Sequence, residues 1–272
     1  MSIIPQEIHD AIGSDDTDRL PAWLHGHPEP SYKELQQCLT IAVPTGSLRM
    51  IKTLLDHGAT LKQLSYNASF ARAEPAVFQQ LIDHGWDINS TEFERPAVQS
   101  VLSSSHPVSY SRNDSRAQRS ESLLRWFLDH GADPNIKSVR RGSCLQPCTA
   151  LAAAARLEDP TALRILLSHG ADMDPLALFN AIGVRGQKNG IATMAVLIEH
   201  GADVNYVAKN WATPLDHAVR FNSKEKLLYL LKHGADPTVR STVRRITPAE
   251  YAQERGRQEL YEILKAAEAG HG

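Results

Sequence analysis

The sequence LLYLLKHGADPT, residues 227–238, contains the pattern that predicts the fold. The dipeptide His-Gly in this stretch also occurs at residues 25–26, 57–58, 84–85, 130–131, 169–170 and 200–201. In the last six copies, the positions three, four and seven residues before the glycine are always apolar, as Leu231, Leu230 and Leu227 are here. These spacings place side chains on one face of an α-helix. We therefore expect six helices that each bury one face and end at the same dipeptide.

The His-Gly pair consists of residues that suit a helix end. Glycine adopts the left-handed conformation after the last helical residue without steric cost. The preceding histidine can bond the last free carbonyl groups and lies favourably at the negative end of the helix dipole. Aspartate and asparagine follow in several copies, as in Asp133 with Asn135 and Asp203 with Asn205, and both are typical of tight turns.

A second, shorter helix is expected before each of these. The clearest starts are TPLDHAV at residues 213–219 and TPAEYA at 247–252, where threonine caps the helix and proline takes its first position. CTALAAAA at residues 148–155 is a looser version of the same start. Neither helix of such a unit buries its apolar face alone, so the units are expected to stack.

Several of these stretches resemble ankyrin repeats: LLDHGAT at residues 54–60, FLDHGADPN at 127–135, LLSHGADMD at 166–174, LIEHGADVN at 197–205, LLKHGADPT at 230–238 and TPLDHA at 213–218. The resemblance runs from about residue 5 to 266 and implies an all-α ankyrin-repeat solenoid of about eight helix–turn–helix units, some degenerate. We expect a single domain, residues 1–272, that ends in a C-terminal cap over about residues 247–268. The usual Thr-Pro-Leu-His motif of the family is imperfect, because Asp216 replaces its histidine and His217 follows one place later.

The resemblance also implies a protruding hairpin, here called a finger, between consecutive units. The 27 residues from Gly58 to Gly85 leave almost no finger after Gly58, and a helix that starts at Asp174-Pro175 leaves none after Gly170. The 46 residues from Gly85 to Gly131 exceed the ankyrin period of about 33. The surplus falls at about residues 103–120, which are rich in Ser and Arg, and we expect a mobile loop there.

Three fingers in the C-terminal half, residues 135–147, 204–213 and 237–247, contain basic residues and no acidic residue. Tyr206 and Trp211 add aromatic side chains of the kind enriched at interface hot spots. The candidate partner-binding residues are Lys137, Arg140, Arg141, Tyr206, Lys209, Trp211, Arg240, Arg244 and Arg245. Because arginine binds carboxylate and phosphate groups through two bonds, the expected partner is another protein with an acidic or phosphorylated segment. The alternative is a solvated edge without a partner.

Composition narrows the class of protein. The 272 residues carry a formal net charge of -2 and 42% hydrophobic residues, which favours a packed core and gives no strong nucleic-acid signal. No apolar run reaches the roughly 20 residues that span a bilayer, and residues 1–16 do not resemble a secretory signal. Three cysteines are too few for a disulfide scaffold, so we expect a cytoplasmic or nuclear protein that does not bind membranes.

No known catalytic motif is present, and no cofactor or metal is expected. Seven of the twelve histidines precede a repeat glycine, and stacking holds them too far apart to share one ion. Cys144 and Cys148 lack a second ligand pair, and GVRGQKNG at residues 183–190 fits a lengthened link between helices.

The expected function is a protein-interaction scaffold or adaptor that uses its concave face and basic fingers. The alternative is an ankyrin-type protein with a small-molecule pocket, with or without enzymatic activity. The candidate catalytic residues would then be Asp216, His217, His106 and Tyr110.

Overall fold

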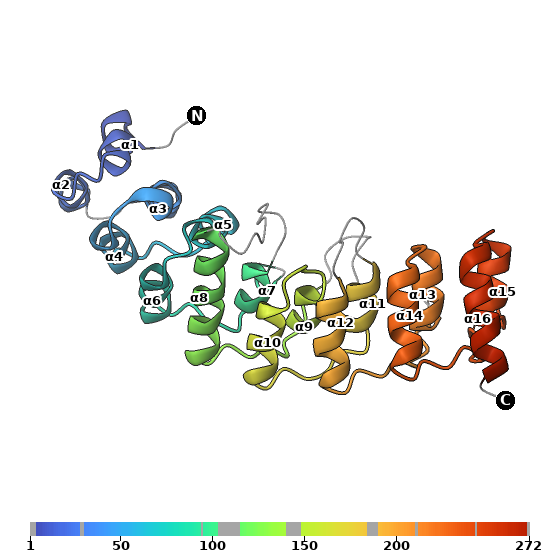
Figure 1. Cartoon of the computed structure of the whole chain (residues 1–272). Helices are drawn as coiled ribbons and strands as arrows, with labels where there is room; N and C mark the ends of the chain where they lie inside the picture. Colours follow the sequence, from blue (N-terminus) through green and yellow to red (C-terminus); the bar gives the residue numbers. More distant parts are fainter. Residues whose placement is uncertain are drawn as a thin grey trace. The chain divides into compact units, whose positions relative to one another are not determined.

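The computed structural model describes residues 4–27, 30–93, 95–102, 115–139, 148–183, 190–209, 212–242 and 244–270, with the side chains described from residue 118 onward in the helix that begins at 115. Within these residues the chain forms α-helices and no strand, as the sequence predicts (Figure 1). The chain separates into two compact units, Met1–Pro147 and Cys148–Gly272. The expected single domain stays a prediction. No helix in the described part is long and apolar enough to cross a membrane.

The N-terminal unit consists of helices that alternate between two rows. Its helices are α1 (Gln6–Gly13), α2 (Arg19–Gly26), α3 (Tyr32–Thr45), α4 (Leu48–Asp56), α5 (Gln63–Arg72), α6 (Pro75–Asp83), α7 (Ala97–Val101) and α8 (Ser115–Asp129). Helix α3 packs against α1 on one side and α5 on the other, while α4 packs against α6. The row of first helices and the row of second helices thus stack separately, as expected for helix pairs that bury their faces against neighbours.

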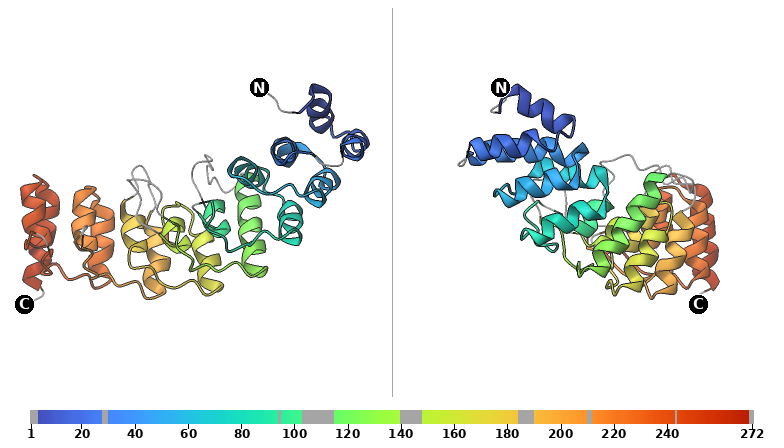
Figure 2. Two further views of the ribbon diagram at one scale, coloured as in Figure 1. Left: turned by 180° about the vertical axis from the view of Figure 1, so that it is seen from behind. Right: turned by 90° about the vertical axis from the view of Figure 1, so that its left-hand side faces the viewer.

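The C-terminal unit repeats this arrangement with four more pairs. They are α9 (Ala150–Ala154) with α10 (Thr161–Ser168), α11 (Ala177–Gly183) with α12 (Gly190–Glu199), α13 (Pro214–Arg220) with α14 (Lys224–Lys232), and α15 (Pro248–Glu254) with α16 (Gln258–Gly270). The first helices pack in the order α9, α11, α13 and α15, and the second helices in the order α10, α12, α14 and α16. Figures 1 and 2 show both rows.

The predicted apolar stripe is the core of the second helices. The positions seven and four residues before the six glycines, such as Leu227 and Leu230, are at most 2% exposed in every copy. The position three residues before is buried in two copies, Leu55 and Leu128, and intermediate in the other four. The stripe prediction is confirmed, and the third position lies at the edge of the buried face.

The predicted helix ends are also confirmed. The six repeat glycines have φ between 81° and 89°, which only glycine adopts without strain. Each preceding histidine uses its Nδ1 atom to contact the carbonyl four residues earlier, at 2.7 or 2.8 Å. The earlier copy at Gly26 differs, because α2 includes this glycine and ends at His27. This difference fits the expectation that some of the helix–turn–helix units are degenerate.

Asparagines join consecutive turns. The Asn205 side chain donates to Gly234 O at 3.1 Å and accepts from Asp236 N at 2.7 Å. Asn89 makes the equivalent pair of bonds to Gly131 O and Asp133 N, at 3.1 and 2.8 Å. Asn205, one of the expected turn residues, and Asn89 therefore each bond the turn of one helix pair to the turn of the next.

One expectation about loops changes. The long loop was expected over residues 103–120, but α8 begins at Ser115, so residues 115–120 are helical; residues 103–114 lie outside the described part. Helix α5 begins at Gln63 and α11 at Ala177, which agrees with the missing fingers. The expected C-terminal cap covers α15 and α16, and the charged side chains of Arg257, Glu259, Glu262 and Lys265 are exposed there.

Candidate functional site

Two fingers of the C-terminal unit carry the candidate site. In the finger before α13, Ala208 and Ala212 exchange backbone hydrogen bonds of 2.8 and 3.0 Å. In the finger before α15, Ser241 N donates to Ile246 O and Arg245 N donates to Ser241 O, both at 3.0 Å. These bonds close each finger into a hairpin and fix the direction in which it presents its side chains.

Each finger leads directly into a capped first helix. Thr213 N donates to Asp216 Oδ2 at 2.9 Å, while Asp216 N donates to Thr213 Oγ1 at 3.1 Å. Thr247 and Glu250 form the same reciprocal pair at the start of α15. This capping box satisfies two backbone N–H groups that a helix start leaves free. The Asp216 carboxylate is thereby held by its own helix start.

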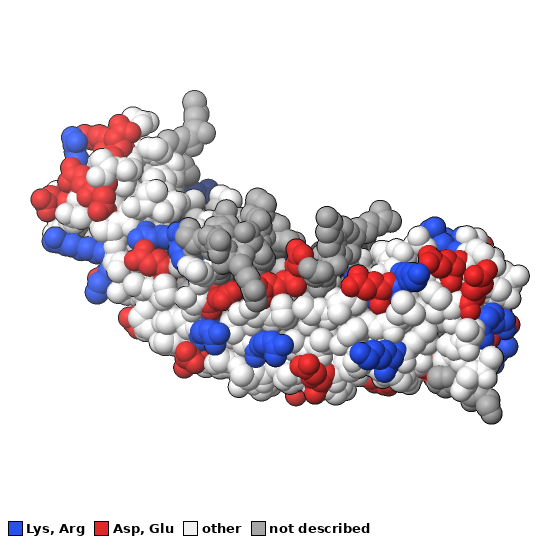
Figure 3. Space-filling view, viewed as in Figure 1, with Lys and Arg blue, Asp and Glu red and all other residues white. Residues whose placement is uncertain are grey.

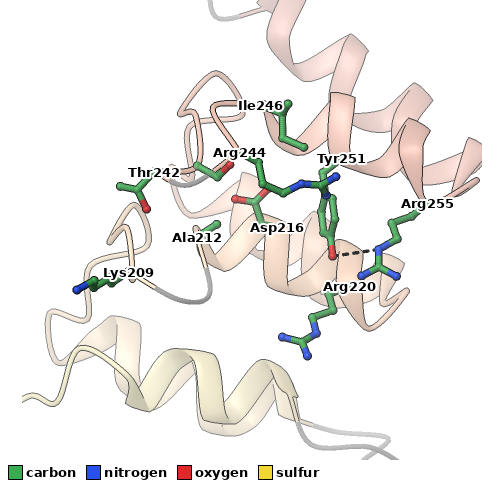
Figure 4. Close-up of a pocket in the computed structure, with 10 residues that line it drawn as sticks. Lys209, Ala212, Asp216, Arg220, Thr242, Arg244, Ile246, Tyr251 and Arg255 are labelled. Atoms are coloured by element: carbon green, nitrogen blue, oxygen red, sulfur yellow. Dashed lines mark hydrogen bonds between the residues drawn. The ribbon is translucent and has the colours of Figure 1, made fainter.

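A cavity of about 390 Å³, here called the finger cavity, lies between these two fingers and the helices that follow them. Its walls include Lys209 from the first finger, Arg244 and Ile246 from the second, and residues of α13 and α15. Figure 4 shows Arg220, Tyr251 and Arg255 converging on one part of this cavity, with Arg244 above the Tyr251 ring and Lys209 farther away. The site is therefore assembled from two consecutive repeats of the C-terminal unit.

The finger cavity is strongly basic. Four of its lining residues, Lys209, Arg220, Arg244 and Arg255, are cationic and exposed, against one lining carboxylate, that of Asp216. Arg244 forms an ion pair with Glu254 at 2.7 Å. Among the described residues, no carboxylate lies within 4.0 Å of the charged nitrogens of Lys209, Arg220 or Arg255. Three positive charges therefore face the cavity without an anionic partner from the described chain.

Tyr251 contacts two arginine side chains on one side of this cavity. Arg255 Nε donates to the Tyr251 hydroxyl at 3.1 Å, and the Arg255 guanidinium lies 5.3 Å from the centre of the ring. The Arg244 guanidinium lies 5.7 Å from the same ring (Figure 4). Both distances permit a cation–π attraction. The ring thus keeps two guanidinium groups close together, although they repel each other.

Some of the basic finger residues predicted to bind a partner already make contacts within the chain. Arg240 forms an ion pair with Glu250 at 3.1 Å and donates to Arg245 O at 2.7 Å. Arg245 and Lys137 are exposed, and the ring of Tyr206, which is 36% exposed, lies 6.3 Å from that of Phe179. The predicted residues Arg140, Arg141 and Trp211 lie outside the described part of the chain.

A second cavity of about 330 Å³, here called the ring pocket, adjoins the same Arg220 side chain. Phe179, His217 and Phe221 form its aromatic walls, with centroid distances of 5.4 Å from His217 to Phe179 and 4.9 Å from His217 to Phe221. Arg156, Asn180 and Gly183 complete it. The first-helix row therefore carries an aromatic pocket next to a basic one.

The candidate acid–base pair Asp216 and His217 is not brought together. Asp216 lines the finger cavity, whereas His217 lines the ring pocket. Burial, together with the positive charges of Arg220 and Lys226, lowers the pKa of His217 to about 4. Burial raises the pKa of Asp216, against the effect of its bonds to Thr213. His106 and Tyr110, the other catalytic candidates, lie outside the described residues.

The candidates predicted from the sequence do not include Arg156, Arg220, Tyr251 and Arg255. Those candidates come from the fingers, whereas these four residues lie in or just after the first helices α9, α13 and α15. A pattern in the sequence was available for two of them. Arg156 and Arg220 each come seven residues after the threonine that caps their helix, Thr149 and Thr213.

On the face shown in Figure 3, Lys and Arg side chains of the C-terminal unit lie among Asp and Glu side chains. In the same view, acidic side chains gather over the N-terminal helices α1 and α2, at the left.

Comparison with known proteins identifies relatives for much of the chain. A family model described as ankyrin repeats, three copies, matches residues 151–241. The ankyrin repeat protein YahD of Escherichia coli K12 is 31% identical over 153 residues, which cover 53% of this chain and 72% of that protein. The mitochondrial disaggregase of Bos taurus is 30% identical over 158 residues, which cover 56% of this chain and 22% of that protein. In structure, the chain is similar to the ankyrin repeat domain of Bcl-3, a member of the IkappaB protein family, with a TM-score of 0.53, 23% identity, and coverage of 84% of this chain and 85% of that one.

Proposed function

The chain belongs to the ankyrin-repeat family, whose members are generally protein-interaction modules, and from that premise we propose that its C-terminal unit captures an acidic segment of another protein. The observation that carries the proposal is the finger cavity, in which Lys209, Arg220 and Arg255 have no carboxylate partner among the described residues. In this role the protein is a scaffold or adaptor, and the partner contacts the first-helix row and the base of the fingers.

Physical chemistry favours an anionic occupant. Positive groups that share a cavity raise the local concentration of anions and repel cations. Arginine binds carboxylates through two parallel hydrogen bonds, which also fix their orientation. Arg240 at the finger edge and Arg244 on the wall of the cavity already form ion pairs with Glu250 and Glu254, so their charges are already compensated within the chain. The partner's negative charge is therefore expected at the cavity and not along the outer edge of the fingers.

A direct binding experiment tests this proposal. Fluorescence polarisation with the full chain would compare a labelled Glu-rich peptide with its Gln analogue and a phosphoserine analogue. We expect salt-dependent binding of the Glu peptide, a loss of at least about tenfold with its Gln analogue, and a similar loss in the Arg220→Glu, Arg255→Glu double variant. Tighter binding of the phosphoserine analogue would identify a phosphorylated partner.

The control variant Arg164→Glu, Lys232→Glu makes the same change in net charge at exposed positions of α10 and α14. It should bind the Glu peptide as the unchanged chain does. Equal losses in both double variants would show that only net charge matters and would contradict a site at the finger cavity.

A small-molecule site is the second candidate function. The two cavities, about 390 and 330 Å³, fall at the lower end of the range of roughly 300–1,000 Å³ that is typical of ligand pockets. A thermal-shift screen of the full chain with anionic metabolites would test it. A rise in Tm that disappears in Arg220→Glu would support a small ligand, and no rise with any compound would exclude those tested. Residence in the cytoplasm or nucleus is part of the proposal, to be checked by imaging the tagged full chain.

A further inference from the structure

We infer that the acidic segment also carries an aromatic side chain, which enters the ring pocket while its neighbouring carboxylate binds Arg220. The inference rests on the proposed function and specifies the chemistry of the partner. It follows from the position of Arg220, which lines both the finger cavity and the ring pocket. A single extended segment that contacts this arginine therefore reaches two cavities of different character.

The walls of the ring pocket favour an apolar ring. Phe179 is fully buried and Phe221 is partly exposed, and both meet His217 in edge-on geometry, with interplanar angles of 76° and 67°. Because burial holds the pKa of His217 at about 4, its imidazole is neutral at neutral pH. Aromatic side chains pack well in such edge-to-face surroundings.

Gly183 lies directly against the aromatic wall of this pocket. A Cβ atom at this position would lie 2.8 Å from His217 Nε2 and 3.3 Å from the Phe221 ring. No side chain fits between the backbone of Gly183 and these rings, so an alanine would displace His217 or Phe221. Replacement of Gly183 by alanine would therefore change the shape of the pocket at its aromatic wall, without a change in charge.

The charges around the pocket explain why the ring is expected next to an acid. Arg156 and Arg220 come from the ends of α9 and α13, on either side of the α11 residues that line the pocket. A guanidinium group can bind a carboxylate at its edge while its face lies over an aromatic ring. Charge complementarity thus selects an acidic segment, and the apolar walls select a ring within it.

Selection from random peptides tests the inference without knowledge of the natural partner. A phage-displayed library of random peptides would be selected on the immobilised full chain. We expect enriched sequences that combine Asp or Glu with a nearby Phe, Tyr or Trp. One enriched peptide would then be synthesised with its aromatic residue changed to Ala, and separately with its acidic residue changed to the amide, for fluorescence polarisation.

Each change should weaken binding by about tenfold or more. On the protein, Phe221→Ala and Gly183→Ala should weaken the aromatic peptide and leave its Ala analogue unchanged. Leu228→Ala, at a 44% exposed position of α14, is the matched control and should change neither. Circular dichroism of each variant would show whether it remains folded, and the Phe221→Leu variant replaces any that does not.

The outcomes separate the inference from the proposed function. Enriched peptides that are acidic but lack a common aromatic residue would overturn the inference and leave the proposed function intact. Enriched peptides without acidic residues, or no enrichment at all, would overturn both. Aromatic peptides that bind Phe221→Ala as tightly as the unchanged chain would place the ring elsewhere and contradict the inference.

Discussion

The N-terminal and C-terminal units pack their helix pairs with different kinds of side chain. In the N-terminal unit, aromatic rings pack within and between helix pairs: the ring centroid of Phe78 in α6 lies 4.9 Å from that of Phe70 in α5 and 4.8 Å from that of Phe127 in α8. In the C-terminal unit, the first helices contribute many small residues, such as the buried alanines of α9, and cavities lined by arginine lie beside them. The comparison shows that large rings pack the pairs of the N-terminal unit, whereas the first helices of the C-terminal unit lie beside cavities lined by arginine and aromatic side chains, where a partner can bind.

The largest expected effect is in the aromatic cluster. Phe78→Ala should destabilise the protein by about 3–5 kcal/mol, because it removes a fully buried ring and leaves a cavity. Urea denaturation followed by Trp fluorescence would measure the loss through Trp86 and Trp126, which lie near Phe78. A loss below 1 kcal/mol would mean that the cluster is not a main source of stability in this unit.

The next effect concerns a basic side chain in each unit that donates hydrogen bonds to carbonyl groups at the C-terminal end of a first helix. Arg72 Nη1 donates to Val43 O and Gly46 O at 3.1 and 2.6 Å, and Lys226 Nζ donates to Ala181 O and Ile182 O at 3.0 and 2.9 Å. Arg72→Met and Lys226→Met should each cost roughly 1–3 kcal/mol, because charged hydrogen bonds to carbonyls are lost. Equal stability of either variant and the unchanged chain in denaturant titrations would contradict this role.

A smaller effect is expected at the asparagines between turns. Asn89→Ala and Asn205→Ala each remove two hydrogen bonds to the following turn and should cost about 1 kcal/mol. Amide hydrogen exchange at Asp133 and Asp236 would report the local effect, since these N–H groups lose their acceptor. Unchanged protection of both amides would show that the asparagines do not join the units.

The smallest effect is a pH dependence confined to the N-terminal unit. His84 Nε2 lies 2.9 Å from Asp56 Oδ1, and this contact raises the pKa of His84 and lowers that of Asp56. The histidine contribution is complete below its ordinary pKa of 6.5 and is lost as pH rises through the raised value. The aspartate contribution is present above its ordinary pKa of 3.8 and is lost as pH falls through the lowered value.

The ion pair therefore stabilises the fold fully between pH 3.8 and 6.5, the ordinary pKa values of aspartate and histidine. Its contribution decreases as the pH rises above 6.5 and His84 loses its proton. The urea midpoint of the unchanged chain should decrease relative to that of His84→Gln between about pH 5.5 and 8.5. Parallel curves for the two proteins over this range would rule out the contribution of the pair.

Much of the fold could be predicted because its pattern is local. The stripe that ends at each His-Gly pair lies within eight residues, so helix position, buried face and left-handed glycine all follow from short spacing. The start of α8 was missed because residues 115–120, SRAQRS, have no apolar stripe to indicate a helix.

The candidate site was less predictable, because it depends on contacts between repeats. The basic count in the fingers was correct, but it did not show that Arg240 and Arg244 fold back onto Glu250 and Glu254 of α15. Arg255 and Tyr251 are four residues apart, which places them on one helical face, but only their position beside the finger makes them part of a cavity.

Hydrogen–deuterium exchange of the full chain, with and without a Glu-rich peptide, would locate the binding site. We expect slower exchange in the C-terminal unit, at residues 203–209, 212–220 and 244–255, and unchanged exchange in the N-terminal unit. Protection confined to the N-terminal unit, or no protection at saturating peptide, would contradict binding at the finger cavity.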